Sequence, residues 1–466
     1  MSNQAELSEK DTEFRNFALH SNMWHVVFYV CAPLALYQSL TQLFKIFDSM
    51  MAAHISANSV SAVAYLSQIN LMLSALGGGL AVGASIKVSE AYGAGDFLLV
   101  KKRVSTLFAM CGILGAGILA ILVPFTPQFL RFARTPEAFI AEGSQYFILE
   151  LFGMVISFFN NVYIAIERAR GNSKRILNLN IIVIVIKLSL TAVFVYVLHS
   201  GINMIAVATI VSQASLLAAA LINLNQKNNA FGFSLSGISM KGEVAMPMIS
   251  LSIPVIIEKA AFALGKVIIN SMSTIYSALT VGALGISNNI GGFSTNPQNG
   301  FQEGGSAIIS QSLGAGQPQR ALQAFKCVFL ICIAIGAVFM CLSLIFLDQI
   351  SWLFSGSDTK FGQMIASIYR LEALGAIPLG MNAAVMALLY GFGKTRVTLL
   401  INFSRVFIFR VPVLWFLQNF TDFGSISVGI VMGVSNISIG ITSLVIGAYE
   451  IRKICREYRI SFWGNA

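Results

Sequence analysis

The sequence predicts an all-α polytopic membrane protein with twelve transmembrane helices in two six-helix lobes, related by a pseudo-two-fold axis along the membrane normal. Its composition is the first observation: apolar residues make up 56% of the 466 residues, charged residues only 11%, and the mean hydropathy is +0.76. Soluble domains carry about a quarter charged residues. A chain this apolar has too few polar residues to cover its surface in water, so we expect lipid to be its solvent.

Apolar runs are the second observation, because a helix needs about 20 such residues to cross a bilayer. The predicted spans are 26–52, 60–90, 103–126, 141–166, 176–199, 203–224, 246–272, 278–312, 324–348, 367–391, 396–418 and 426–449. Several exceed the minimum length, so we expect some to be tilted or broken.

Charges between the spans predict the orientation. If the N-terminus is cytoplasmic, the inside segments hold nineteen Lys and Arg residues, whereas the outside segments hold only Arg131, Arg134 and Lys360. Cytoplasmic loops carry the excess of basic residues. We therefore predict a multi-pass protein of the bacterial inner membrane with both termini cytoplasmic. The net charge of +10 reflects this topology and not a nucleic-acid surface, because the basic residues are scattered singly.

An internal repeat is the third observation. At a spacing of about 221, Pro33 falls on Pro254, Lys45 on Lys266, and Gly93-Ala-Gly95 on Gly314-Ala-Gly316; at 220, Gly171–Lys174 falls on Gly391–Lys394. Each half holds six helices, so the halves are parallel repeats with the substrate cavity expected between them. The predicted organisation is a cytoplasmic tail (1–24), an N-lobe (25–224), a cytoplasmic linker (225–244), a C-lobe (245–450) and a second cytoplasmic tail (451–466).

Four motifs then resemble a known family. Ile46–Met50 and Gly83–Asp96 are similar to the first two helices of the multidrug and toxic compound extrusion (MATE) family, within the multidrug/oligosaccharidyl-lipid/polysaccharide flippase superfamily. Ser310–Gly316 and Tyr390–Thr395 resemble the matching motifs of its second lobe. The resemblance extends over about 25–450.

The resemblance implies secondary active efflux by cation antiport and alternating access: a multidrug transporter giving antibiotic resistance by exporting small organic compounds, cationic or amphipathic. The alternative is a flippase of a lipid-linked oligosaccharide or another lipid precursor, because related flippases share the architecture. The partners implied are a small-molecule substrate, a coupling proton and the bilayer, with no nucleic acid and a monomeric state.

Asp48, near the end of the first predicted helix, is the strongest acidic candidate. An ionisable residue inside a span is costly and by default indicates function. The resemblance makes it the family acid that takes part in proton or sodium coupling. The alternative is an i,i+3 salt bridge to Lys45 on the same helix.

The fifth predicted helix departs from the family, which has an Asn and, four residues later, an Asp there. This sequence has Lys187 and Thr191 instead, and Thr209 stands where the family has a further ligand. One hydroxyl does not offset the loss of two oxygen ligands. We expect Lys187 to act as a tethered cation that faces Asp48, with proton rather than sodium coupling. Alternatively, Lys187 lines a wet cavity without a fixed partner.

The second lobe also departs from the family, because Phe262 and Leu379 stand where relatives keep acids. Glu258 and Glu303 are the acids offered instead, unless Lys266 or Lys259 simply neutralises them. Pro and Gly residues around Glu303 predict a broken helix. The residues expected to line the substrate cavity are Tyr37, Gln38, Glu258, Lys266, Gln302, Glu303 and Asn382.

No motif supports an enzyme, a metal site or a cofactor. Gly77-Gly-Gly79 has no preceding strand and no Walker lysine, so helix packing explains it better than phosphate binding. The six cysteines form no CxxC pair and most lie in apolar runs, where they act as small core residues. We expect energy to come from an ion gradient, and an intramembrane enzyme is the alternative from another class.

Overall fold

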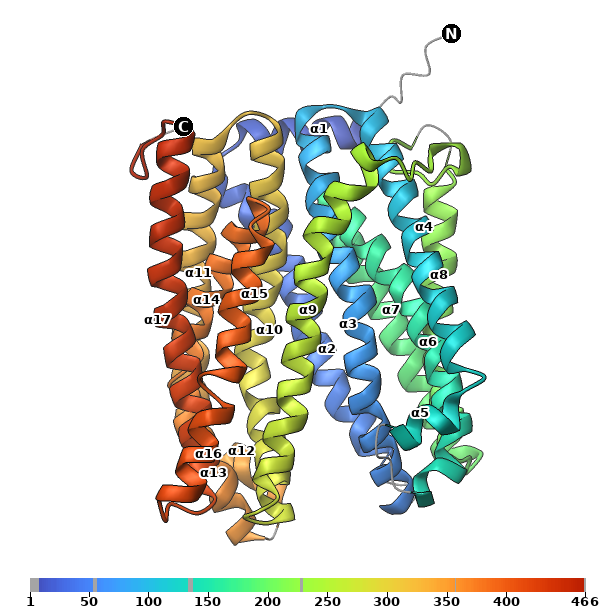
Figure 1. Ribbon diagram of the computed structural model, residues 1–466, viewed down its shortest axis with the longest axis vertical. Coiled ribbons are helices and arrows are strands. Elements are labelled where there is room, and N and C mark those ends of the chain that lie inside the picture. The colour runs from blue at the N-terminus through green and yellow to red at the C-terminus, as the bar shows by residue number, and fades with distance from the viewer. Residues whose placement is uncertain (1–7, 53–56, 133–136, 227–228, 357, 465–466) are drawn as a thin grey trace. The chain divides into compact units, whose positions relative to one another are not determined.

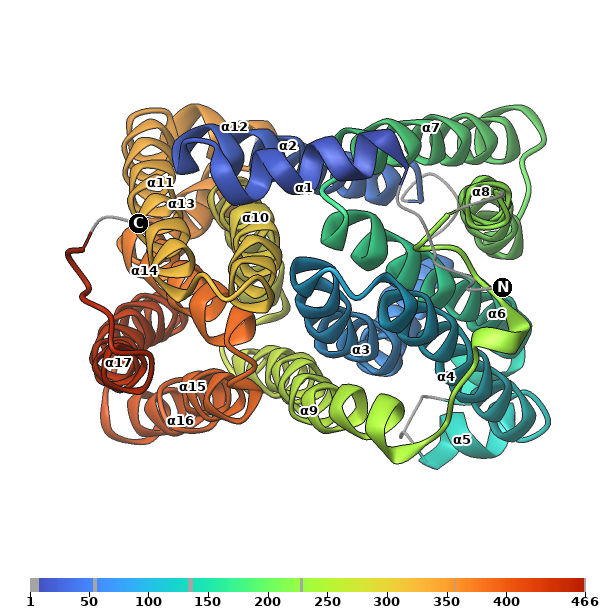
Figure 2. The same cartoon turned by 90° about the horizontal axis from the view of Figure 1, so that it is seen from above.

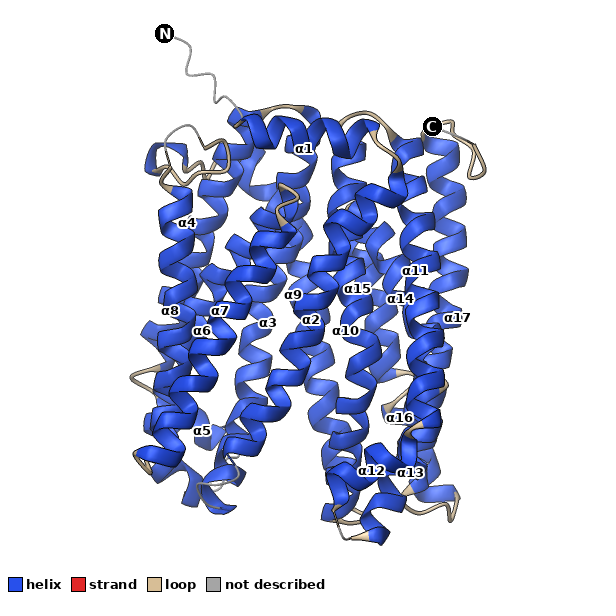
Figure 3. Cartoon of the chain, turned by 180° about the vertical axis from the view of Figure 1, so that it is seen from behind, coloured by secondary structure: helices blue, strands red, loops and turns tan. Residues whose placement is uncertain are grey.

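The protein is all-helical in a computed structural model (Figure 1). The structure describes residues 8–52, 57–132, 137–226, 229–356 and 358–464, without the side chains at 45–46, 48–52, 57–65, 67–68, 137–139 and 141–142. Within these ranges every regular element is a helix and there is no strand (Figure 3).

The helices follow one another in chain order as α1 (Glu9–His20), α2 (Met23–Ala52), α3 (Ala57–Ala94), α4 (Phe97–Leu122), α5 (Thr126–Phe132), α6 (Glu137–Ala169), α7 (Ser173–Ala192), a π-helical turn (Val193–Val197), α8 (Ile202–Leu224), a 3₁₀ turn (Leu235–Gly237), α9 (Gly242–Ser273), α10 (Ala278–Gly314), α11 (Pro318–Ile345), α12 (Leu347–Ser355), α13 (Thr359–Ala373), α14 (Ala376–Gly391), α15 (Thr395–Phe407), α16 (Val411–Phe420) and α17 (Ile426–Glu457).

Helix length and apolarity confirm the predicted class of polytopic membrane protein. Among the described residues, ten helices are long and apolar enough to cross a membrane, and eleven if α13 and α14, which meet at 47°, form one bent span. The 37-residue helix α10 is long enough to be the twelfth. It is less apolar than the other spans because Ser, Asn, Gln and Gly replace aliphatic residues along it.

Glycines at helix ends reveal the repeat and correct its register. Gly95 and Gly316 follow α3 and α10 with φ of +80° and +71°, a conformation in which only glycine is free of strain. Gly171 and Gly393 stand likewise two residues before α7 and α15, with φ of +77° and +69°. Gly171 therefore matches Gly393, at a spacing of 222. Its predicted match to Gly391 was wrong, because Gly391 belongs to α14.

The chain divides into two compact units. Unit 1 contains the described residues of Met1–Phe17 and Leu43–Ala260, and unit 2 contains Ala18–Gln42 and Ala261–Ala466. The divisions fall inside α1, α2 and α9. Most of α1 and the first part of α9 therefore pack in unit 1, and the first part of α2 packs in unit 2. The predicted lobes 25–224 and 245–450 stay a prediction.

In unit 1, α9 packs closely on α3 through a pair of glycines. A Cβ atom added to Gly79 would lie 2.6 Å from the Cα atom of Ile256, and one added to Gly83 would lie 2.4 Å from that of Ser252. Ser252 Oγ also donates to the Leu80 carbonyl at 3.3 Å. Small residues spaced by four let membrane helices approach in this way.

Unit 2 contains the same contact 221 residues away, between α10 and α2. A Cβ atom on Gly300 would lie 2.5 Å from the Cα atom of Ala35, and one on Gly304 would lie 2.6 Å from Cys31 Sγ. Here the prediction of a broken helix around Glu303 was wrong: α10 is continuous through Pro297, and its glycines serve helix packing.

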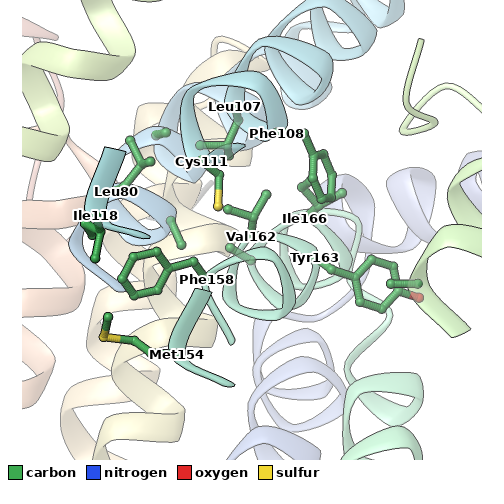
Figure 4. Close-up of a cluster of buried hydrophobic side chains, with 14 of the residues drawn as sticks. Leu80, Leu107, Phe108, Cys111, Ile118, Met154, Phe158, Val162, Tyr163 and Ile166 are labelled. Carbon is green, nitrogen blue, oxygen red and sulfur yellow. The ribbon is translucent and has the colours of Figure 1, made fainter. Parts of the chain in front are cut away.

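The core of unit 1 lies among α3, α4, α6 and α8, which pack side by side (Figure 2). Figure 4 shows Leu107 and Cys111 of α4 directed toward Phe158 and Val162 of α6, and all four side chains are fully buried. The Phe158 ring occupies the space that the absent side chain of Gly77 leaves free. This confirms that helix packing explains the glycine run.

The core of unit 2 lies among α10, α11, α13, α14 and α17 (Figure 2). Almost every residue of α14 is buried. By contrast, α11 has a strongly apolar composition but only 22% of its most apolar stretch is buried inside the protein, which is typical of a helix facing lipid.

Helix α1 is anchored on unit 1 by polar contacts. Arg170 donates from Nε and Nη2 to the two carboxylate oxygens of Asp11, both at 2.8 Å, and Tyr92 Oη donates to the Asp11 carbonyl at 2.7 Å. Arg15 donates to the Tyr92 and Gly93 carbonyls at the end of α3. These contacts place α1 within the segment 1–24, which the sequence predicts as a tail.

Candidate functional site

The predicted coupling residues of unit 1 lie on α2, α7 and α8. The side chain of Asp48 falls outside the described residues, so the pairing of Asp48 with Lys187 or with Lys45 stays a prediction. Lys187 is half-buried on α7, within a strongly apolar span of 25 residues. It takes part in interactions there and is not an isolated charge.

Two threonines, one on α7 and one on the adjacent helix α8, offer oxygen atoms in unit 1. Thr191 follows Lys187 by one helical turn and is fully buried, and its hydroxyl has no hydrogen-bond partner among the described residues. Thr209 on α8 is half-buried and donates to the Ile205 carbonyl at 3.1 Å. Because α7 packs against α8, this part of unit 1 combines a cation with one unsatisfied hydroxyl.

The predicted cavity residues belong to different parts of the fold. Tyr37 and Gln38 are half-buried on α2, as are Gln302 and Glu303 on α10, all within unit 2. Glu258 is buried on α9 within unit 1.

Asn382 and Lys266 have defined surroundings in unit 2. Asn382 is buried on α14, and its Oδ1 accepts from Ser443 Oγ at 2.6 Å, which is a helix-packing contact between α14 and α17. Lys266 is exposed on α9, its Nζ lies 5.4 Å from the centre of the Phe262 ring, and it interacts electrostatically with Glu372.

Two acids that lie inside predicted spans were not among the site residues predicted from the sequence. Glu150 on α6 is half-buried, and Asn70 Nδ2 lies 3.5 Å from its Oε2. Glu372 on α13 is buried and accepts a hydrogen bond from the Ser287 hydroxyl. The two acids lie 222 residues apart, which is also the spacing between the first residues of α6 and α13. The rule that an acid inside a span indicates function applied to both.

Glu372 belongs to a buried charged group in unit 2 that includes two arginines, of which Arg405 is half-buried. Arg410 is 5% exposed and donates from Nε to Ser435 Oγ at 2.9 Å and from Nη2 to Asn436 Oδ1 at 3.1 Å. Arg405 donates from Nη2 to the same Asn436 oxygen at 2.8 Å. Both guanidinium groups interact electrostatically with Glu372.

Helix breaks position these charges. α13 ends just after Glu372, and α14 begins at Ala376 with Pro378 in its first turn. α15 ends at Phe407, and Arg410 directly precedes α16, whose second residue is Pro412. Proline is tolerated in a first turn because its missing N–H would have no partner there, and it ends the helix before it. Non-helical backbone at membrane depth is tolerated inside protein or beside a cavity.

Comparison with known proteins agrees with this fold. The family model described as MatE matches the chain twice, over residues 33–193 and 254–416, which are the two halves of the repeat. The chain is 23% identical over 410 residues to "Probable multidrug resistance protein YoeA" of Bacillus subtilis (strain 168), and the match covers 86% of this chain and 88% of that protein.

Solved structures share the fold at low sequence identity. A structure of MATE in complex with MaL6 matches with a TM-score of 0.90 at 18% identity, covering 96% of this chain and all of that one. An outward-facing multidrug resistance MATE family transporter of the MOP superfamily matches with a TM-score of 0.88, also at 18% identity, over 96% and 99% of the two chains. A Pyrococcus furiosus transporter of that superfamily, described as having a binding pocket of reverse polarity that suggests a different function, matches with a TM-score of 0.89 at 18% identity, over 96% and 99%.

Fold and repeat define a multi-pass membrane transporter built by duplication. The chain belongs to the MATE family. It is a transporter and not an enzyme.

Proposed function

We propose that this chain exports small amphipathic organic compounds across the bacterial inner membrane by alternating access, in exchange for protons. Membership of the MATE family supports the antiport mechanism. The observation that carries the choice of ion is the position of Lys187, half-buried on α7 and one helical turn from Thr191. The monomeric state and the cytoplasmic location of both termini are part of the same proposal.

Sodium is a poor fit to these residues. A sodium ion needs several oxygen ligands at once, as hard cations do. Thr191 brings one hydroxyl, the Thr209 hydroxyl already donates to a backbone carbonyl, and a nearby ammonium group repels a second cation. A proton needs only one titratable group, and Asp48 is our candidate for it. Protonation of Asp48 would release its attraction to the lysine.

Amphipathic substrates fit the charges of the protein better than plain cations. The buried charged group of unit 2 contains two arginines and a single glutamate, and it would repel a simple organic cation. This observation also favours the second candidate function, a flippase of a lipid-linked precursor, because such a lipid carries phosphate.

Drug susceptibility of an efflux-deficient host distinguishes the two functions. Cells producing the wild-type protein should tolerate higher concentrations of several amphipathic dyes and antibiotics than cells with an empty vector. Lys187→Met should abolish this protection, whereas Lys174→Met, an exposed position at the start of the same helix, should retain it. Unchanged susceptibility across the panel, with normal amounts of protein in the membrane, would contradict export and favour the flippase.

A further inference from the structure

Three cations of unit 2 surround one aromatic ring. The guanidinium carbons of Arg405 and Arg410 lie 5.3 Å and 5.7 Å from the centre of the Phe262 ring, and Lys266 Nζ lies 5.4 Å from it. Such distances allow cation–π attraction, which holds the cationic groups in place but removes no charge. Phe262 itself is only partly buried.

The hydrogen bonds of the two arginines leave their charge uncompensated. Each guanidinium carries five N–H donors and always remains charged. Within the described part of the chain, Arg405 and Arg410 donate only to the neutral oxygens of Ser435 and Asn436, and Arg405 Nε is buried without a partner.

In the described parts of unit 2, one carboxylate interacts with both arginines, and it cannot balance their two charges. Glu372 attracts Arg405 and Arg410 electrostatically, but its described hydrogen bond comes from Ser287 and not from an arginine. Two guanidinium groups and one carboxylate leave a net positive charge inside a membrane span. A buried charge without a counter-ion is strongly destabilising, so a second anion would stabilise this part of unit 2.

We propose that Arg405 and Arg410 form a binding site for an oxyanion, a carboxylate or a phosphate, borne by an amphipathic molecule. Planar guanidinium groups suit both anions because they can donate two parallel hydrogen bonds. The break before α16 presents Arg410, and the partly buried Phe262 ring offers an apolar surface for the hydrocarbon part. This inference rests on the proposed export of amphipathic compounds and names the charge of their polar group.

Calorimetric titration of the purified full-length protein in an uncharged detergent tests the site. The probes are octyl phosphate and octyltrimethylammonium, which have the same chain and opposite charge, and heats of mixing with protein-free micelles are subtracted. Wild-type protein should bind octyl phosphate about tenfold tighter or more, as a charge-assisted hydrogen bond implies. Equal affinity for the two probes would overturn the proposal.

Variants tie the binding to the two arginines. Arg405→Gln and Arg410→Gln should each weaken octyl phosphate binding about tenfold or more, while Arg396→Gln, exposed on the same helix as Arg405, should leave it unchanged. Arg405→Lys keeps the charge without the planar fork and should show an intermediate loss, which provides a test if a Gln variant fails to fold. Unchanged binding by monodisperse Arg405 variants would refute the site.

A lipid arm identifies the bearer of the anion. The titration is repeated in nanodiscs of phosphatidylcholine alone and in nanodiscs that also contain phosphatidic acid. Competition by phosphatidic acid would support the site and identify its natural ligand as a lipid phosphate. Undiminished binding of octyl phosphate would also support the site and identify its natural ligand as a soluble amphipathic molecule. None of these measurements needs an ion gradient, so failure of proton-driven export leaves their result unaffected.

Discussion

Replacing Asp11 by Asn removes the carboxylate that joins α1 to the end of α6. Asp11 is 5% exposed, and both of its carboxylate oxygens accept from Arg170 at 2.8 Å. Burial favours loss of the Arg170 proton, but the hydrogen bonds from Asp11 and the charge of Glu167 raise the Arg170 pKa above its ordinary value. Folding therefore stabilises the charged form of Arg170. This stabilisation is complete at every pH below the pKa that arginine has in the unfolded state, so Arg170 stays charged throughout the working pH range.

The expected cost follows from what remains around Arg170. Breaking a buried ion pair costs about 3–5 kcal/mol when the remaining charge is left unpaired. Here Glu167 stays within 3.2 Å of Arg170 Nη1, and Asn keeps one oxygen acceptor. We therefore expect Asp11→Asn to cost about 2 kcal/mol, the usual contribution of a hydrogen bond to a charged group.

A double-mutant cycle measures this coupling. Asp11→Asn, Arg170→Gln and the double variant are unfolded in micelles that mix dodecyl sulfate with an uncharged detergent, and helix content is followed by circular dichroism. Glu13→Gln, exposed on α1, is the control and should change the free energy of unfolding by less than about 0.5 kcal/mol. A coupling energy below about 0.5 kcal/mol would mean that the pair behaves like an exposed one, and would refute the reasoning.

The remaining predictions concern packing, topology and the coupling ion. Gly300→Ala should destabilise the protein by about 1–3 kcal/mol, because the new Cβ atom meets the α2 backbone. The control Gly285→Ala places its Cβ atom in open space on the same helix and should be neutral or stabilising. Equal melting temperatures of the two variants would contradict the α2–α10 contact. Cysteines placed in 200–203 or 419–425 should react with an impermeant reagent added outside intact cells, and reaction only after permeabilisation would contradict the proposed topology. Lys187→Asn combined with Thr191→Asp restores the family's oxygen ligands. This double variant should make transport sensitive to sodium, or at least remove the dependence of transport on protons. A double variant with wild-type ion dependence would count against the role of Lys187.

Hydropathy and duplication were sufficient to predict the helical fold. Each predicted span corresponds to a helix or a pair of helices, because crossing a bilayer requires long apolar runs. Repeat spacing also predicted that Pro33 and Pro254 hold equivalent places, and they lie in α2 and α9, which are both divided between the two units. That division itself depends on contacts distant in the chain, between Gly300 and Ala35 for example, which no local pattern reveals.

The candidate site was less predictable. The sequence predicts a broken helix at Gly300 and Gly304, whereas the structure uses both glycines for helix packing. Membrane helices use glycine for close packing as well as for helix termination. Because the second lobe lacks the family's acids, the sequence points to Glu258 and Glu303 as their substitutes. Glu372 also lies inside a predicted span, but it was not among the predicted site residues. Its surroundings depend on Arg405 and Arg410, which approach it only through the tertiary fold.

Transport by purified wild-type protein in liposomes tests the central claim most directly. An amphipathic dye is followed under a proton gradient without sodium, and separately under a sodium gradient at equal pH on both sides. Proton-coupled antiport through the region of Lys187 and Asp48 predicts dye movement under the proton gradient and none above protein-free liposomes under the sodium gradient. Robust movement driven by sodium at equal pH would contradict the account, because it would place a second cation beside Lys187.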